Sequence, residues 1–311
     1  MNHLRSFHRV AAHLWAPHRA HRLARCFVAG TILAAGSAAA AGVPRSDRVP
    51  APHPVSTPAA APIRGVDSMW VWRDRPAGNL ATAAQDLGID RVFLFVGKSS
   101  ASGDANIARS VRLLQVRGIS VFALSGEPAW TFQHKAALAW AHRALALAPF
   151  DGLHLDVEPA ALPHWRKHQQ VLVADYLRLL DRLAPLGGPL EVDAQFAYGS
   201  ITTPDGTFAD DILSRVDAVT VMSYRDRAFG NNSTTAVAAD WLQRAASAGK
   251  PVWLAAETNR EPDCPSCTFY QEGQTRMAKV LGQVDTWAGA RYPTYQGISI
   301  EDLDGWLALK P

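Results

Sequence analysis

Short apolar, strand-like runs alternate with helix-length segments eight times between residue 65 and the C-terminus, and this alternation restricts the chain to very few folds. The clearest helical pattern runs from about His168 to Ala184, and Gly187 and Gly188 follow it as a stop signal. The strand-like runs begin at Met69, Arg91, Ile119, Gly152, Leu190, Ala218, Pro251 and Gly297.

Eight successive βα units predict an α/β protein with a single (β/α)8 TIM barrel in residues 65–311. A doubly wound open sheet is the competing architecture. We favour the barrel because the count is eight, and because no glycine-rich phosphate loop follows any of the strand-like runs.

The N-terminal part of the chain has the pattern of an export signal. Residues 1–25 contain five Arg and five His without an acid, and an apolar run from Cys26 to Ala35 and a stretch of small residues follow. The apolar run is about half the ~20 residues that span a bilayer. We predict a cleaved signal peptide over residues 1–41, with an uncleaved membrane anchor as the alternative. Residues 42–64 are rich in Pro and Ala and predict a disordered linker.

Charge and cysteine content fit a secreted or periplasmic protein. The formal net charge of +3 includes five positive charges in residues 1–41, so the remainder carries 3 − 5 = −2. We therefore expect no nucleic-acid partner and, after cleavage, no stable membrane insertion. Cys264 and Cys267 have no second Cys or His pair nearby, which favours a disulfide within a loop over a zinc or redox site. The oligomeric state stays open.

The most polar strand-like run is FDGLHLDVEP, residues 150–159. Side chains alternate along a strand, so His154, Asp156 and Glu158 share one face, and Pro159 ends the strand directly after Glu158. In parallel barrels, catalysis takes place at the C-terminal ends of the strands. Glu158 is therefore the candidate general acid, and Asp156 would raise its pKa through like-charge repulsion. In the structural alternative, His154 and Asp156 form an ion pair inside the barrel.

Other strand ends also carry polar or aromatic side chains. Glu257 follows the seventh strand and is the candidate nucleophile or base, although it could also pair with Arg225 or Arg260. Two carboxylates on different strands suit glycoside hydrolysis. No cofactor and no metal ion are predicted. The candidate contacts to a carbohydrate substrate are Tyr224, Asp193, Gln195, Trp130, Trp306, Arg225 and Glu301.

Two motifs resemble the chitinase-like family 18 of glycoside hydrolases. DGLHLDVE is similar to the DGxDxDxE strand of that family, with His154 in place of an Asp, and VMSYRD is similar to its sixth-strand motif, with Arg225 in place of an Asp. The resemblance implies that Glu158 is the acid, while Asp156 orients and Tyr224 hydrogen-bonds an acetamide group of the substrate. At the place of the family's eighth-strand Trp, this sequence has Glu301.

A second resemblance is to the clan of retaining barrel glycosidases with an acid in an NEP-like motif. VEP at residues 157–159 and AAETN around Glu257 are similar to its two catalytic motifs, with Val157 in place of Asn. The whole chain also resembles exported bacterial proteins. The two glycosidase resemblances imply an enzyme that cleaves a glycan, and the third resemblance implies export.

Two other functions compete with glycan cleavage. His154, Asp156 and Glu158 on one strand face could hold a divalent metal ion in a hydrolase. Alternatively, the barrel binds a glycan or a protein partner without catalysis, since His154, Arg225 and Glu301 replace family residues.

Overall fold

The protein is a closed barrel of eight parallel strands surrounded by helices, as the computed structural model of residues 60–311 shows. The strands close in the order β1-β10-β9-β8-β5-β4-β3-β2. The predicted (β/α)8 TIM barrel is thereby confirmed. The predicted signal peptide, residues 1–41, and residues 42–59 of the predicted linker lie outside the described residues.

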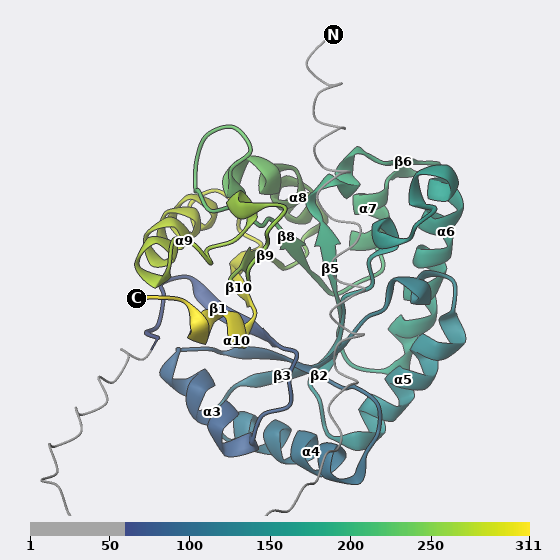
Figure 1. Cartoon of the computed structure of the whole chain (residues 1–311). Coiled ribbons are helices and arrows are strands. Elements are labelled where there is room, and N and C mark those ends of the chain that lie inside the picture. The colour runs from purple at the N-terminus through teal and green to yellow at the C-terminus, as the bar shows by residue number, and fades with distance from the viewer. Residues whose placement is uncertain (1–59) are drawn as a thin grey trace, which may run out of the picture.

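All eight strand-like runs of the sequence form barrel strands (Figure 1). The barrel strands are β1 Val66–Val71, β2 Arg91–Phe95, β3 Ser120–Ser125, β4 Gly152–Leu155, β5 Leu190–Gln195, β8 Ala218–Met222, β9 Val252–Glu257 and β10 Tyr295–Glu301. A short antiparallel hairpin, β6 Thr202–Thr203 with β7 Gly206–Thr207, interrupts the connection after β5.

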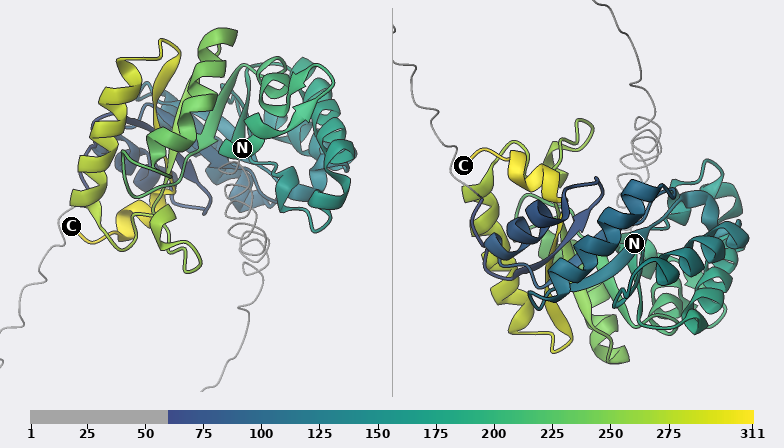
Figure 2. Two further views of the ribbon diagram at one scale, coloured as in Figure 1. Left: turned by 90° about the horizontal axis from the view of Figure 1, so that it is seen from above. Right: turned by 90° about the horizontal axis from the view of Figure 1, so that it is seen from below.

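Helices follow the strands and cover the outside of the barrel, as the views in Figures 1 and 2 show. They are α3 Ala77–Asp86, α4 Ala101–Gln115, α5 His134–Leu147, α6 Trp165–Leu183, α7 Phe208–Leu213, α8 Thr234–Ala248, α9 Gln274–Gly289 and α10 Leu303–Ala308. The short α10 packs against β1 and β10, and the backbone N–H of Gln274 at the start of α9 donates to the carbonyl of Lys310 near the C-terminus.

The barrel buries both faces of its sheet, which explains why its strands are nearly continuous apolar runs. Outward-facing side chains pack under the helices; on α6 the predicted apolar face is buried, including Leu172, Tyr176 and Leu183. Ala60 and Ile63, at the end of the predicted linker, are buried in the same outer core. Among residues 60–311, no helix is both long and apolar enough to cross a bilayer.

The polar strand is shorter than its sequence pattern predicts. The alternation indicates a strand through Glu158, whereas β4 ends at Leu155, the last residue of β4 paired with β5. The backbone N–H of Asp156 still donates to the carbonyl of Ser125, 3.1 Å away, and thereby continues the direction of the strand. Gly126 lies so close to this segment that a Cβ atom there would be 2.1 Å from the carbonyl oxygen of Asp156.

We expect Gly126→Ala to destabilise the fold, because its methyl group would overlap backbone atoms of the segment that carries Glu158. The free energy of unfolding should fall by about 1–3 kcal/mol, measured by urea denaturation with Trp fluorescence as the signal. Gly78→Ala is the matched control, because nothing lies within 4 Å of a Cβ atom built there. Equal urea midpoints for the two variants would contradict the expected overlap.

Candidate active site

An ion pair occupies the middle of the barrel. The His154 side chain has no exposed surface, and its Nε2 lies 3.0 Å from Oδ1 of Asp193, while its Nδ1 lies 3.4 Å from Oε2 of Glu191. The imidazole ring stacks on Phe93 with 3.7 Å between ring centroids. Trp70 donates from its indole N–H to the other oxygen of Asp193 at 3.2 Å. These contacts place Asp193, a predicted substrate contact, in the interior layer around His154.

The carboxylates of β5 hold His154 in its protonated form. Burial alone would lower the pKa of His154, but the charges and hydrogen bonds of Asp193 and Glu191 outweigh burial and raise its pKa to about 9. The ring is therefore an imidazolium at neutral pH. His154 therefore forms an ion pair inside the barrel, which is the structural alternative of the sequence analysis, and its partners are Asp193 and Glu191 of the neighbouring strand.

A second charged layer lies nearer the N-terminal ends of the strands. Arg91 donates to Glu191, and its guanidinium lies over the rings of Phe122 and Trp253, 4.5 Å and 4.4 Å from their centroids. Trp253 donates to Asp67 at 3.1 Å. Burial raises the pKa of Asp67 to about 6, although hydrogen bonds from Ser68 and Trp253 and the charge of Arg91 oppose it.

At the opposite, C-terminal mouth of the barrel, Glu158 lies directly after β4 and precedes the 3-10 helix η3, Pro159–Ala161. Its buried carboxylate accepts a hydrogen bond of 3.1 Å from Nε2 of Gln195, the last residue of β5. Asp156, also buried, precedes Glu158 by two residues. The structure thus joins the candidate acid to one of the predicted substrate contacts.

Two buried phenols accompany these carboxylates. They are Tyr176 of α6 and Tyr198 of the 3-10 helix η5, Phe196–Ser200. Burial raises the pKa of both phenols, and the negative charge of Glu158 raises it further. Tyr176 belongs to the apolar helical face, so its pattern in the sequence indicated only packing.

Glu257, at the end of β9, is buried and hydrogen-bonded within its own loop. Its Oε1 accepts from the backbone N–H groups of Thr258 and Asn259, at 2.9 Å and 2.7 Å, and from the amide of Asn259 at 2.9 Å. Such donors stabilise an ionised carboxylate. The candidate second carboxylate is therefore held in position by the first turn of the loop that follows it.

Two further predicted contacts, from the strands on either side of β9, meet at the mouth. Tyr224, two residues beyond the end of β8, donates from its hydroxyl to the carboxylate of Glu301 at the end of β10. Next to it, Asp302 accepts from the backbone N–H of Gly305 at 2.8 Å. Burial raises the pKa of Asp302, and the hydrogen bond from Gly305 opposes this.

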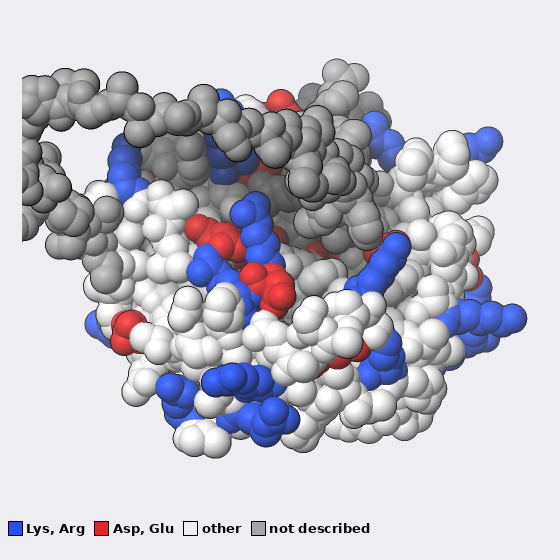
Figure 3. Space-filling view, turned by 60° about the horizontal axis from the view of Figure 1, so that its bottom comes forward, with Lys and Arg blue, Asp and Glu red and all other residues white. Residues whose placement is uncertain are grey.

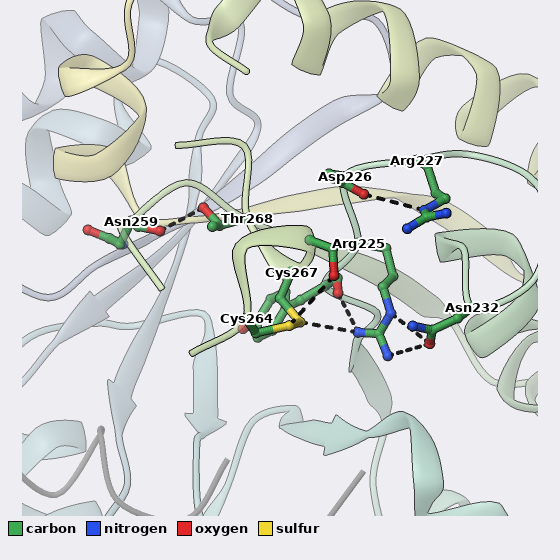
Figure 4. The surroundings of a disulfide bond; sticks show 10 residues. Arg225, Asp226, Arg227, Asn232, Asn259, Cys264, Cys267 and Thr268 are labelled. Atoms are coloured by element: carbon green, nitrogen blue, oxygen red, sulfur yellow. Dashed lines mark hydrogen bonds and ion pairs between the residues drawn. A yellow bond between two sulfur atoms is a disulfide. The ribbon is translucent and has the colours of Figure 1, made fainter. Parts of the chain in front are cut away.

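Figure 4 shows a disulfide between Cys264 and Cys267 in the loop after β9, where the sequence predicts it. Both cysteines pack against the aromatic interior of the barrel. Arg225 connects this loop to the one after β8: its guanidinium contacts Cys267 and donates two hydrogen bonds to Asn232, at 2.9 Å and 2.8 Å. Arg225 thus ties the two loops together, and its contact with a substrate stays a prediction.

The two predicted tryptophan contacts lie in the outer core. Trp130, in the 3-10 helix η2, Pro128–Thr131, packs against Trp140 of α5, and Trp306 of α10 has no exposed surface. Neither offers an open ring face at the mouth. Instead, Trp72 and Phe95 lie at the C-terminal ends of β1 and β2, partly exposed and 5.5 Å apart between ring centroids.

The period of two along the first two strands could have identified this aromatic pair. Trp70 and Phe93 pack in the interior around His154, so Trp72 and Phe95 point inward one layer nearer the mouth. The mouth therefore has an apolar arc at β1 and β2 and a polar arc from β4 through β10.

On the face in Figure 3, acidic and basic side chains lie next to one another. Within residues 60–311, no group of three or more His, Cys, Asp or Glu side chains is arranged to hold a metal ion. His154, a candidate metal ligand in the sequence, has each ring nitrogen bonded to a carboxylate of β5.

No protein-family model matches the chain, and no curated protein matches it in sequence. Similar solved structures include an endo-beta-N-acetylglucosaminidase from Cordyceps militaris, with 16% identity over 76% of this chain and 81% of that one, at a TM-score of 0.47. A glycoside hydrolase family 17 beta-1,3-glucanosyltransferase from Rhizomucor miehei is 12% identical, and the match covers 77% of this chain and 87% of that one at a TM-score of 0.48. A dipeptide epimerase from Enterococcus faecalis is 15% identical, and the match covers 81% of this chain and 58% of that one at a TM-score of 0.44.

The strand order makes the chain a closed (β/α)8 barrel, and the solved structures similar to it include glycoside hydrolases. The epimerase shows that the neighbours differ in chemistry, so the likeness concerns the fold and selects no activity. The case for an activity has to come from the site.

We expect the free energy of unfolding to decrease between pH 7 and pH 9. The pKa of His154 is about 9 in the folded protein and 6.5 for the free side chain, so the ion pair contributes fully below pH 6.5 and is lost as the pH rises through 9. The full contribution is on the order of 3 kcal/mol. Urea denaturation at pH 7, 8 and 9 measures it.

His154→Gln should lower stability at pH 7 and flatten this dependence, because it removes the titrating group. His142→Gln, at an exposed position of α5, is the control and should keep the wild-type slope. A wild-type slope in His154→Gln would show that His154 does not carry the effect.

Proposed function

We propose that the protein is an exported glycoside hydrolase that cleaves a glycan with Glu158 as the general acid. The observation that carries the proposal is the two-sided mouth of the barrel: Trp72 and Phe95 on one arc, and the carboxylates of Glu158, Glu257 and Glu301 on the other. A sugar ring has apolar C–H faces and a polar edge of hydroxyl groups. It therefore fits between an aromatic surface and hydrogen-bonding carboxylates.

In the proposed reaction, Glu158 protonates the glycosidic oxygen as the bond to the leaving sugar breaks. Glu257 either attacks the anomeric carbon, forming a glycosyl-enzyme that water then hydrolyses, or removes a proton from a water molecule that attacks this carbon directly. Gln195 orients Glu158 through their hydrogen bond, and Asp156 acts on Glu158 electrostatically. Tyr224 and Glu301 contact the sugar. The hydrogen bond from the Tyr224 hydroxyl to the Glu301 carboxylate fixes the positions of both side chains on the polar arc.

A non-catalytic glycan-binding barrel is the second candidate. It is favoured by the environment of Glu257, whose Oε1 already accepts three hydrogen bonds from its own loop. Arg225, which stands at the place of a family Asp, is likewise engaged with Asn232 and Cys267. Under this alternative, Glu158→Gln leaves glycan binding intact and there is no turnover to lose.

The deciding experiment is release of reducing sugar by the full-length protein from a panel of polysaccharides that includes chitin and peptidoglycan glycan strands. We expect one of them to be cleaved, and Glu158→Gln to lower kcat by about 100-fold or more, because the leaving oxygen is no longer protonated.

Asp86→Asn is the control for loss of a carboxylate, since Asp86 is exposed at the end of α3, and it should keep wild-type activity. Turnover that survives in Glu158→Gln would remove Glu158 from the mechanism. Absence of turnover on the whole panel would leave the binding alternative.

A further inference from the structure

A groove with a volume of about 610 Å³ lies on the outer wall of the barrel, between α5 and α6, which pack side by side (Figure 1). Phe132 and Lys135 line it from the start of α5. Asp175, Arg178 and Arg182 line it from α6, where their spacing of i, i+3 and i+7 puts them on one face of the helix. None of the residues that line this α5–α6 groove belongs to the candidate active site.

Positive charge exceeds negative charge in the groove. Lys135, Arg178 and Arg182 line it together with one carboxylate, that of Asp175. Arg178 donates to Asp175, whereas within residues 60–311 neither Lys135 nor Arg182 forms an ion pair with a carboxylate. The first turn of α5 contains no acidic residue that could offset Lys135. Two cations are thus left for a negatively charged ligand.

Phe132 adds an uncovered aromatic ring to these charges. It is 51% exposed, whereas Trp130, two residues earlier, is 7% exposed and packs against Trp140. Among the lining residues that the structure describes, Phe132 is the one large hydrophobic side chain, and the others are polar, charged or small. An exposed aromatic ring offers a face on which the apolar C–H side of a sugar ring stacks.

The size and composition of the groove distinguish between classes of anion. A volume of this order accommodates a ligand with several rings, far more than a single phosphate or sulfate ion. A protein partner buries about 800 Å² on each side of a standard interface around a core of several apolar or aromatic side chains. Phe132 alone does not supply such a core. A sugar unit that carries a carboxylate combines an apolar face with negative charge, as the groove requires.

We therefore infer that the α5–α6 groove binds an acidic polysaccharide, whose sugar units carry carboxylates, with one sugar face on Phe132 and carboxylates on Lys135 and Arg182. The planar guanidinium of Arg182 suits a carboxylate, because it can donate two parallel hydrogen bonds to it. The inference goes beyond the proposed function, since the groove holds the polymer on the outer wall whether or not the mouth cleaves it.

Calorimetric titration of the full-length protein with polygalacturonate and with hyaluronate tests the inference. Fully methyl-esterified polygalacturonate is the neutral comparison, because it keeps the sugar chain and loses the charge. We expect one of the two acidic polymers to bind, with an affinity that falls between about 50 mM and about 300 mM NaCl. If this polymer is polygalacturonate, its ester should bind at least about tenfold more weakly.

Substitutions in the groove should change this affinity in both directions. Lys135→Gln and Arg182→Gln should each weaken binding by roughly threefold, and Phe132→Ala by roughly fivefold. Asp175→Asn should strengthen binding, because it removes the carboxylate of the groove and releases Arg178 for the ligand.

Lys279→Gln and Arg276→Gln are the matched controls. Both side chains are exposed on α9, which follows β9, and β9 lies opposite β3 in the closed barrel. They should bind the polymer as wild type does. Groove variants that match these controls, or wild type that binds neither acidic polymer, would overturn the inference.

Polyglutamate distinguishes an acidic protein partner from a polysaccharide. We expect it to bind more weakly than the acidic polysaccharide, because it has no sugar face to stack on Phe132. Equal affinities for the two polymers, unchanged in Phe132→Ala, would show that the groove recognises negative charge alone and would overturn the assignment to a polysaccharide.

Binding and cleavage are measured separately, so their failures are distinguishable. A protein that releases no sugar but binds the acidic polymer through Lys135, Arg182 and Phe132 loses only the hydrolase proposal. A protein that releases sugar at the mouth but binds none of the acidic polymers in the groove loses only this inference.

Discussion

The imidazolium of His154 between Asp193 and Glu191 is the interaction on which the barrel interior depends. A charge inside a closed barrel has no water to solvate it, so its partners must come from neighbouring strands. Aromatic rings surround the ion pair: Phe93 stacks on the imidazole, and Trp70 donates to Asp193. Loss of one partner would leave the other charges buried without compensation.

This interior layer also positions the mouth above it. Although β4 ends at Leu155, the hydrogen bond from the backbone N–H of Asp156 to the carbonyl of Ser125 continues the direction of the strand, so the segment with Asp156 and Glu158 leads from His154 to the mouth. On β5, Asp193 stands two residues before Gln195, which holds Glu158. The pairing of β4 with β5 therefore aligns the ion pair and the candidate acid together.

The loops after β8 and β9 form the other half of the site; hydrogen bonds connect the two loops, and a disulfide lies within the second. Arg225 contacts Asn232 within its own loop and Cys267 in the disulfide loop. Further along, Thr268 bridges to Glu257 and its hydroxyl donates to the carbonyl of Asn259. Glu257 therefore belongs to one braced segment that continues through Thr268 to Tyr270.

The sequence by itself determined the barrel, since apolar runs and helical periodicity are properties of neighbouring residues that backbone geometry translates directly into strands and helices. It also placed Glu158, Glu257, Tyr224 and Glu301 at strand ends, all of which lie at the mouth. Only the tertiary structure decided which side chains meet there. His154 pairs with Asp193 and Glu191 because of the register of β4 and β5, which no local pattern contains.

The same distinction explains the aromatic residues. Trp130 and Trp306 pack in the outer core while Trp72 and Phe95 reach the mouth, because the direction of a ring in a loop or a short helix depends on what packs around it. Barrel closure also set β1 beside β10, a relation between residues far apart in the chain. Local periodicity involves a few neighbouring residues, whereas barrel closure and strand register couple strands that are distant in the chain. For that reason the fold could be predicted from the sequence, and the set of residues that forms the site could not.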